Sequence, residues 1–379
     1  MERKPVLSFY TNMPTPYQLD FIEALKECFE LRVIYFTVRE ADRQWQLSTT
    51  GKGYSVVVLK NSRFAIWMQK RVPSFHFSRK IISLLRKDDA DYVLVNGTYW
   101  SPNVILALYI SYRKKKKVSF WSEPVFPVKS PFLFLIKKIM LFPVMRYTHF
   151  LLAIGKQAVD GYRKYGYKKD IHNIPYNINS RLFAKENLQQ AIFEKLVQQY
   201  KPGSGTVLLT SGSLIHRKGM DTIIRAFLQL PDSLNVCLLI MGDGEQKDDL
   251  KALCNNDHRI HFLGFQEKHM IPYWFSLADI FVFASRYDGW GLVINEAVAS
   301  ETAIICSKSV GAATDKLIDQ YSAILVEADD IPGFSAAMQK LVKDKQSRER
   351  IISNSASLKQ ELSSDYNAKK VFDIYRSTQ

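Results

Sequence analysis

The chain has few cysteines, and their spacing holds neither a metal ion nor a disulfide framework. Four cysteines are spread over 379 residues without the close pairs that zinc sites use. Three fall in apolar or helical stretches, so we interpret them as reduced core thiols of a cytosolic protein. The four are Cys28, Cys237, Cys254 and Cys306.

Export and membrane-spanning signals are also missing. The first ten residues run directly into a strand pattern, without the apolar segment of a signal peptide. The most apolar stretch, residues 131–146, is interrupted by Lys137, Lys138, Pro143 and Arg146 and is therefore unsuited to span a bilayer. We expect a cytoplasmic protein.

Motifs of metal and nucleic-acid sites are absent as well. No Asp-x-Asp stands in the context of a site, and no calcium loop occurs. The histidines lack helical metal spacing with a third ligand, so we expect no metal site and no cofactor. Lys and Arg are not interleaved with aromatic residues as in RNA or DNA motifs, which argues against a nucleic-acid partner. The histidines considered are His216, His258, His261 and His269.

Positive charge is what the chain has in excess. There are 52 Lys and Arg against 37 Asp and Glu, a formal net charge of +15. Such an excess indicates an anionic partner, which is a nucleic acid, a membrane surface or the phosphates of a nucleotide. A hydrophobic content of 47% is typical of a globular protein, and the length suffices for two domains.

Strand-like and helical patterns alternate in both halves, which predicts α/β units with parallel sheets covered on both faces. Helices are expected at residues 21–29, 75–87, 103–112, 156–164 and 366–376. Strands of the first half are expected at 6–10, 31–37, 55–59, 92–96, 118–121 and 150–153. Strands of the second half are expected at 206–210, 235–241, 259–262, 280–284, 303–306 and 323–326.

The chain is organised around residues 286–300, which follow an apolar strand pattern and lead into a helical one. Two glycines bracket Trp290, and carboxylates stand at Asp288 and Glu296. Glycines let backbone N–H groups approach a ligand closely, a helix N-terminus suits a phosphate, and carboxylates accept hydrogen bonds from sugar hydroxyls. The alternative is a solvated Asp in a turn and an ordinary surface Glu. The glycines are Gly289 and Gly291.

The same stretch resembles the acid-x7-acid motif of family 4 retaining glycosyltransferases, which belong to the glycosyl transferases group 1. Asp288 stands at the first acid, Trp290 replaces the usual Phe, and Glu296 stands at the second acid. The Gly and Pro that often follow are absent. The resemblance implies a GT-B fold, in which two Rossmann-like domains face a central cleft. It also implies that Asp288 holds sugar hydroxyls, that Glu296 holds the ribose, and that the loop up to Leu292 lies near the diphosphate.

Residues 211–221 resemble the diphosphate clamp of that family. Ser213 replaces the usual Arg, and Arg217 beside Lys218 is a candidate for the missing charge. A cationic pair at the start of a helix can stabilise a diphosphate leaving group, although a basic helix cap is the alternative. The matching residues are Gly212, Leu214, Lys218 and Gly219.

The next loops agree with the nucleotide loop and base pocket of the resembled family. Gly242 follows a strand, and Gly264-Phe265 follows another. We expect Gly242, Gly264 and Phe265 to contact the donor, although a lone Gly-x-Gly is a weak signal. Trp290 and Tyr287 are candidates to stack on a base or sugar, with core packing as the alternative.

The first half supplies the expected acceptor side. Its opening loop, from Asn12 through Pro14 to Tyr17, resembles the start of one branch of the family, with a proline-shaped turn as the alternative. Asn96 and Glu123 follow strands, where open α/β sheets place ligands. Ser122 stands where relatives often have a His, so the role of that His is unassigned here. Glu123 is the expected sugar or acceptor contact near the reaction centre.

Residues 131–146 favour a membrane-surface helix over a core helix with snorkelling lysines. The basic run 113–117 has a solvated helix cap as its plainer interpretation.

We predict two domains, residues 1–175 joined by 366–379, and residues 176–365. The predicted function is retaining, metal-independent transfer of a hexosyl group from a UDP- or GDP-linked sugar to a glycan or lipid-linked acceptor. The expected setting is cell-envelope polysaccharide or lipopolysaccharide biosynthesis at the inner face of the cytoplasmic membrane, on an anionic surface. The alternatives are a nucleotide-sugar epimerase of the same fold and a basic nucleic-acid- or membrane-binding protein without catalysis.

Overall fold

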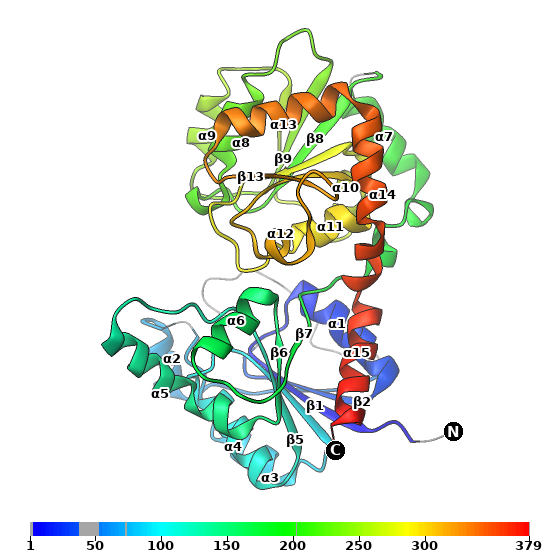
Figure 1. Ribbon diagram of the computed structural model, residues 1–379. Coiled ribbons are helices and arrows are strands. Elements are labelled where there is room, and N and C mark those ends of the chain that lie inside the picture. Colours follow the sequence, from blue (N-terminus) through cyan, green and yellow to red (C-terminus); the bar gives the residue numbers. More distant parts are fainter. Residues whose placement is uncertain (1–2, 38–52, 73, 202, 379) are drawn as a thin grey trace. The chain divides into compact units, whose positions relative to one another are not determined.

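The chain forms two compact units. The computed structural model describes residues 3–37, 53–72, 74–201 and 203–378. Unit 1 comprises Met1–Tyr176 and Ser364–Gln379, and unit 2 comprises Asn177–Ser363 (Figure 1). The chain thus passes from one unit to the other beside residue 175, where the sequence predicts the boundary.

Unit 1 contains a seven-stranded parallel sheet in the order β3-β2-β1-β4-β5-β6-β7. Because helices cover both faces, its central strands are mostly apolar and buried along their length rather than alternating, and all six residues of β1 are buried. The order reverses between β1 and β4, as in dinucleotide-binding sheets. The strands are β1 (Val6–Thr11), β2 (Glu30–Tyr35), β3 (Ser55–Val58), β4 (Tyr92–Asn96), β5 (Lys117–Ser122), β6 (Phe150–Ala153) and β7 (Ile171–Asn173).

The helices of unit 1 lie in two groups. In Figure 1, α1 and α15 lie on one side of the sheet, and α3, α4 and α5 on the other. The helices are α1 (Pro16–Cys28), α2 (Arg63–Gln69), α3 (Lys80–Lys87), α4 (Pro102–Arg113), α5 (Pro131–Tyr147), α6 (Lys156–Lys164) and α15 (Ser364–Ser377).

The C-terminal helix α15 belongs to unit 1 through its aromatic residues. Tyr375 is fully buried, and its hydroxyl donates to the Val93 carbonyl oxygen at 3.0 Å. The Phe372 ring meets that of Phe29 edge-on at 5.3 Å. A buried tyrosine with a satisfied hydroxyl fixes both the depth and the rotation of the helix.

One sequence expectation for unit 1 is wrong, and two elements of the unit were not predicted. The helix expected at 75–87 begins only at Lys80. His76 is buried, and its backbone N–H donates a hydrogen bond to the Ser101 hydroxyl oxygen at 3.3 Å. This tertiary contact holds the segment out of the helix. The sequence also misses α2, and it misses the short strand β7.

The basic run 113–117 is partly a helix cap, although for a neighbouring helix. The Lys114 ammonium donates to the carbonyl oxygens of Leu85 at 3.3 Å and Arg86 at 2.8 Å, at the end of α3. The Lys116 ammonium donates to the Ala90 carbonyl oxygen. Lys114 therefore satisfies terminal carbonyl groups of α3, whereas Lys116 satisfies a carbonyl group in the segment that follows it.

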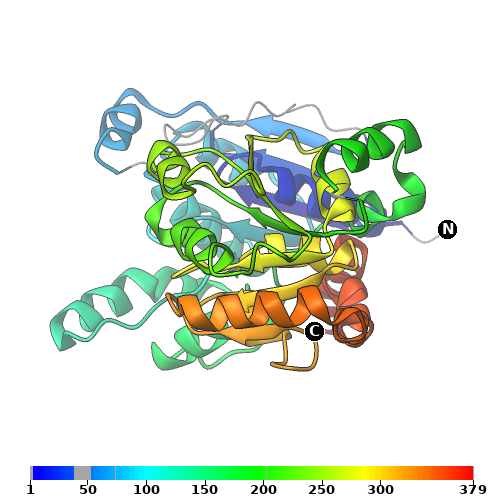
Figure 2. The same ribbon diagram turned by 90° about the horizontal axis from the view of Figure 1, so that it is seen from above.

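Unit 2 contains a six-stranded parallel sheet in the order β10-β9-β8-β11-β12-β13. The reversal lies between β8 and β11, so unit 2 repeats the layout of unit 1. Its helices also lie in two groups, with α8, α9 and α13 on one face and α10, α11 and α14 on the other (Figures 1 and 2). The strands are β8 (Thr206–Ser211), β9 (Val236–Met241), β10 (Ile260–Gly264), β11 (Ile280–Phe283), β12 (Ala303–Ser307) and β13 (Ile324–Val326). The helices are α7 (Gln190–Tyr200), α8 (Met220–Phe227), α9 (Lys247–Leu253), α10 (Ile271–Leu277), α11 (Val293–Ala299), α12 (Gly311–Lys316), α13 (Ile331–Lys343) and α14 (Lys345–Glu361).

Candidate active site

The strand order of unit 2 marks the place where a ligand is expected. Open α/β sheets bind ligands outside the carboxyl ends of the strands, at the point where the strand order reverses. In unit 2 this point lies between β8 and β11. The loops that leave these strands are residues 212–219 and 284–292, which contain the predicted diphosphate clamp and the first acid of the predicted motif.

A cation and a carboxylate meet between these two loops. The Lys218 ammonium donates to the Asp288 carboxylate, and each side chain is only 15% exposed. The ammonium also lies 5.2 Å from the centroid of the Phe283 ring, at the end of β11. Arg217 adds a second cation 3.7 Å from the same carboxylate. The sequence reasoning named Lys218 and Asp288 separately, and the fold pairs them.

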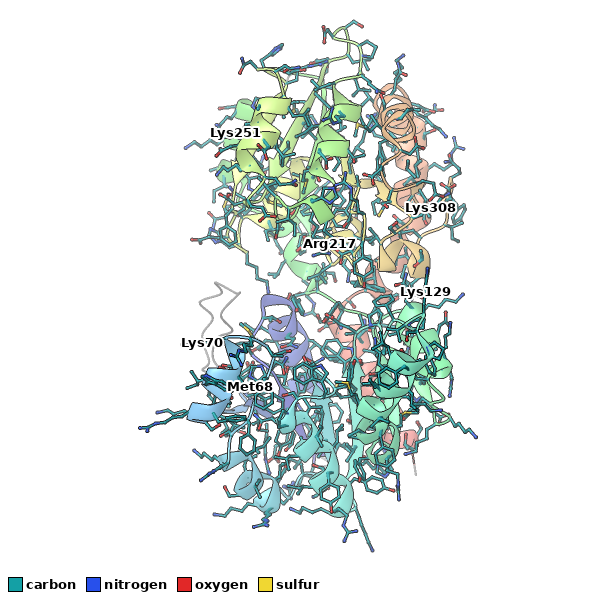
Figure 3. The ribbon with its side chains drawn as sticks, turned by 90° about the vertical axis from the view of Figure 1, so that its left-hand side faces the viewer. Met68, Lys70, Lys129, Arg217, Lys251 and Lys308 are labelled. Carbon is teal, nitrogen blue, oxygen red and sulfur yellow. The ribbon has the colours of Figure 1, made fainter. Side chains whose placement is uncertain are left out.

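The two loops are joined by backbone contacts as well. The backbone N–H of Arg286 donates to the Arg217 carbonyl oxygen at 2.9 Å. The Ser285 hydroxyl lies 3.1 Å from the same oxygen and 3.0 Å from the Tyr287 carbonyl oxygen. The Arg217 guanidinium donates to that Tyr287 oxygen at 2.8 Å. The backbone of Arg217 is therefore held in place, while its side chain, labelled in Figure 3, is 45% exposed.

Arg286 is a positioning residue that the sequence reasoning missed. Its guanidinium donates two hydrogen bonds to Asp221, at 2.9 and 2.8 Å, and lies 2.7 Å from Asp329. Burial raises the pKa of the Asp221 carboxyl, but the hydrogen bonds and charge of Arg286 outweigh burial and leave the pKa below its usual value. Arg286 thus attaches the β11 loop to the start of α8.

The loop after β9 packs tightly against the loop after β8. A Cβ atom on Gly242 would lie 1.9 Å from the Gly212 carbonyl oxygen, so no other residue fits there without a backbone shift. The Leu214 N–H donates to the Asp243 carbonyl oxygen at 2.9 Å. Both predicted glycines thus shape the site. Gly264 lies at the end of β10, and the Phe265 ring beside it is 65% exposed.

The loop after β11 is held by the loop after β12. Gly291 has a φ of +83°, and a Cβ atom there would lie 2.6 Å from the Val310 side chain. The Gly311 N–H donates to the Asp288 carbonyl oxygen at 3.0 Å. In the described part of the chain, the N–H groups of Gly291 and Leu292 have no hydrogen-bond partner, so they are free to meet a ligand.

One predicted stacking residue is a core residue instead. The Trp290 ring is only 2% exposed, and its N–H donates to the Asn295 side-chain oxygen at 3.0 Å. Its interpretation as a stacking surface for a base or sugar is therefore wrong, and core packing is correct. Glu296 lies half-buried in the first turn of α11. That helix has only seven residues, so its dipole is a smaller aid to anion binding than the sequence pattern suggests.

The predicted acceptor-side residues gather at the carboxyl edge of the unit 1 sheet. The Asn12 side-chain oxygen is buried beside Gly97 and has no hydrogen-bond partner among the described residues. An unsatisfied buried oxygen is expected to meet a donor group of a ligand or water. Asn96, in contrast, accepts from Gln18 at 2.8 Å and donates to Trp121 at 2.8 Å, so it is a structural residue in this structure.

Glu123 is exposed at the end of β5 and accepts a hydrogen bond from the Tyr176 hydroxyl at 2.5 Å. The Tyr176 ring meets that of Tyr17 at 4.8 Å, so the fold brings two predicted residues together through a third that the sequence did not indicate. Pro14 is buried and shapes the loop only. Ser122 turns inward, 2.7 Å from the Tyr162 hydroxyl, and so does not occupy the place of a surface His.

The described residues form neither a metal site nor a membrane-spanning helix. Within the described ranges, no three His, Cys, Asp or Glu side chains come close enough together to bind a metal ion. None of the helices in those ranges combines the length and apolarity that crossing a bilayer requires.

Comparison with known proteins shows that part of the chain is similar to a family of glycosyltransferases. Residues 192–358 match the family described as glycosyl transferases group 1. The chain is 31% identical over 153 residues to the lipopolysaccharide core biosynthesis glycosyltransferase LpsE of Rhizobium meliloti. The match covers 40% of this chain and 43% of that protein. It is 28% identical over 163 residues to an N-acetylgalactosamine-N,N'-diacetylbacillosaminyl-diphospho-undecaprenol 4-alpha-N-acetylgalactosaminyltransferase of Campylobacter jejuni, covering 42% of each chain. The matched stretches thus span less than half of these relatives.

Solved structures extend the likeness over both units. The crystal structure of Anabaena Alr3699/HepE in complex with UDP superposes with a TM-score of 0.76 and 16% identity, covering 98% of this chain and 100% of that chain. At this identity the likeness shows the fold, and the predicted GT-B fold is confirmed. The predicted resemblance to group 1 glycosyltransferases is confirmed as well.

Proposed function

We propose that this chain, a GT-B protein similar to the group 1 glycosyltransferases, transfers a hexosyl group from a nucleotide diphosphate sugar to a hydroxyl group. The observation that supports the proposal is the Lys218–Asp288 pair at the strand-order reversal of unit 2. A cation there suits a diphosphate, and the adjacent carboxylate suits sugar hydroxyls. Supporting the nucleotide class, the similar Anabaena protein was solved with UDP.

The residues of unit 2 receive separate roles. Lys218 and Arg217 neutralise the diphosphate, helped by the N–H groups of Gly291 and Leu292. Binding a diphosphate draws Lys218 away from Asp288, which frees that carboxylate to accept hydrogen bonds from the sugar. Glu296 holds the ribose. Gly212, Gly242, Gly264 and Gly289 provide backbone contacts, and the exposed Phe265 ring provides a surface for the base.

The reaction breaks the bond between the anomeric carbon and the diphosphate oxygen, which leaves with the electron pair. The acceptor oxygen forms its bond to the anomeric carbon on the same face, so the configuration is retained, and its proton passes to the departing phosphate. No protein nucleophile is invoked, so catalysis rests on positioning and on stabilising the leaving group. Asn12, Tyr17 and Glu123 orient the acceptor, and no metal takes part.

We further propose that the acceptor is a glycan or lipid-linked glycan of cell-envelope polysaccharide or lipopolysaccharide biosynthesis, met at the inner face of the cytoplasmic membrane. The similar Rhizobium and Campylobacter proteins are named for lipopolysaccharide core biosynthesis and for a diphospho-undecaprenol acceptor. The test is incubation with labelled UDP- and GDP-sugars and a bacterial lipid extract in EDTA. Label that enters the lipid with the anomeric configuration of the donor supports the proposal. Donor epimerised without acceptor would contradict it and favour the epimerase alternative.

A further inference from the structure

Helix α5 leaves most of its surface uncovered. It buries Leu141 and Val144 and stacks the Phe134 ring on that of Tyr165, with centroids 4.5 Å apart. Met145 and Tyr147 are partly buried against the same core, but most of its other apolar residues are exposed, so the alternative of an ordinary core helix is wrong. The exposed ones are Phe132 (70%), Leu133, Leu135, Ile136, Ile139 (63%), Met140 and Phe142.

A shallow depression on one face of α5 combines apolar side chains with cations. It has a volume of about 450 Å³ and is lined by Leu135, Lys138, Ile139, Phe142, Met145 and Arg146. The Arg146 guanidinium lies 5.3 Å from the centroid of the Tyr112 ring, which holds this cation at the rim. Acyl chains suit such apolar side chains, and phosphate groups suit such cations.

Helix α2 repeats this combination at a second place in unit 1. Its residues Phe64, Ile66 and Trp67 are each more than half exposed. The Arg71 guanidinium lies over the Trp67 ring, 5.1 Å from its centroid. Figures 1 and 2 show α2 and α5 projecting from unit 1 on the same side, and Figure 3, which faces that side, labels Lys70 after α2 and Lys129 before α5.

The sequence segments that contain the two helices have no carboxylates of their own. Residues 53–87 and 124–159 contain no Asp or Glu, whereas they contain eight and five Lys or Arg residues. The excess positive charge of the whole chain lies in unit 1, which has 32 Lys and Arg against 15 Asp and Glu. Unit 2 has 20 against 22. The net positive charge of the chain therefore does not come from unit 2, which contains the predicted diphosphate clamp.

We infer that α2 and α5 form a two-point docking face for an anionic lipid bilayer. Exposed aromatic and aliphatic side chains enter the headgroup boundary, while the surrounding cations pair with lipid phosphates. A second copy of the chain is a poor occupant, because packing like faces together would oppose cations to cations. Two separate contacts also fix the tilt of unit 1 on the surface, which one helix would leave free. The inference rests on the proposed function, because a lipid-linked acceptor is the reason for the enzyme to bind a membrane.

The test is co-sedimentation of the full chain with vesicles of phosphatidylcholine, with and without about one third phosphatidylglycerol. Wild type should bind the anionic vesicles only, and less at high salt. The variants Phe132→Ser with Ile139→Ser, and Ile66→Ser with Trp67→Ser, should each lower the partition coefficient by about tenfold or more.

A matched control comes from unit 2. Ile318 is 61% exposed, close to the value for Ile139, and Ile318→Ser should bind vesicles as wild type does. Wild-type binding by either double variant would overturn the two-point inference, as would equal binding of neutral vesicles. A dimer in light scattering that Phe132→Ser with Ile139→Ser dissociates would assign α5 to a second copy instead.

Nucleotide binding separates this inference from the proposed function. Each variant is also titrated with UDP and GDP. Retained nucleotide binding with lost vesicle binding in the double variants supports the docking face, and it shows that unit 2 is folded. Failure of wild type to bind vesicles, with nucleotide binding intact, would remove the docking face alone. Vesicle binding without nucleotide binding would leave the docking face and remove the proposed function.

Discussion

Replacing Lys218 with Ala should weaken both nucleotide binding and sugar transfer while unit 2 stays folded. The Lys218 ammonium is held between the Asp288 carboxylate and the Phe283 ring, at the strand-order reversal. In the proposed complex it turns to the diphosphate. Its removal therefore takes a charged hydrogen-bond donor from the ligand without removing any apolar core residue.

The magnitudes follow from ordinary interaction strengths. A hydrogen bond to a charged group contributes about 1.5–3 kcal/mol net, which corresponds to roughly a 10- to 150-fold rise in the dissociation constant of UDP. Loss of one preorganised stabiliser of the leaving group lowers turnover by about 10²–10³-fold. Because Arg217 remains 3.7 Å from Asp288, the carboxylate is not left alone, and the free energy of unfolding should fall by only about 1–2 kcal/mol.

The assay is calorimetric titration with UDP and GDP in EDTA, followed by donor turnover with lipid extract. Lys316→Ala is a matched control, because that side chain is 19% exposed and its ammonium pairs with the Glu361 carboxylate at 3.0 Å rather than with Asp288. It should change neither value.

Asp288→Asn should not weaken nucleotide binding in the calorimetric titration, in contrast to Lys218→Ala. It frees Lys218 from its carboxylate partner, so UDP alone should bind as well as to wild type or more tightly, while transfer is lost. The reasoning is refuted if Lys218→Ala binds the nucleotide and turns over donor like wild type, or if Asp288→Asn weakens UDP binding as Lys218→Ala does.

Three further outcomes follow from the same loops. Arg286→Ala should lower the free energy of unfolding by about 2–3 kcal/mol at neutral pH. Because Asp221 has a lowered pKa in the folded protein, this difference is present above its unfolded pKa of about 3.9 and should shrink as pH falls through its lower folded pKa, as urea titrations at several pH values would reveal. Gly242→Ala forces a Cβ atom against the Gly212 carbonyl oxygen, so it should lower Tm and abolish nucleotide-induced stabilisation. Trp290→Phe should cost about 1 kcal/mol for the lost buried hydrogen bond but leave the dissociation constant of the nucleotide unchanged, whereas a stacking role would raise it.

The sheet strands could be predicted because burial on both faces makes them continuous apolar runs. β4 and β6 match their expected residues, and the strands of unit 2 differ by one or two residues at their ends. The segment 75–79 could not be predicted, because its conformation depends on contacts with residues 101–103 that no local pattern reveals.

The sequence predicted which residues form the site, but not which of their side chains contact one another. Spacing and resemblance indicated Lys218 and Asp288, yet 70 residues separate them, and only the strand order brings them together. Arg286 gave no signal, because its role depends on Asp221 and Asp329 reaching it from two other elements. Trp290 shows the converse, since glycines on both sides suggest exposure although the ring is buried.

The exposure of α5 could not be decided from sequence either. Its lysines are compatible with snorkelling from a core helix as well as with a membrane face. Only the packed structure reveals that Leu141 and Val144 alone are buried along it.

The central claim is that the β8 and β11 loops bind a nucleotide diphosphate. The most direct measurement is thermal unfolding of the purified protein with UDP, GDP, ADP and their sugar conjugates, in EDTA. At about 100 times the dissociation constant, one nucleotide family should stabilise the protein by about 2.7 kcal/mol, raising Tm by roughly 5–10 °C. Lys218→Ala should lose that shift, and Lys316→Ala should keep it. No shift with any nucleotide at saturating concentration would contradict the account.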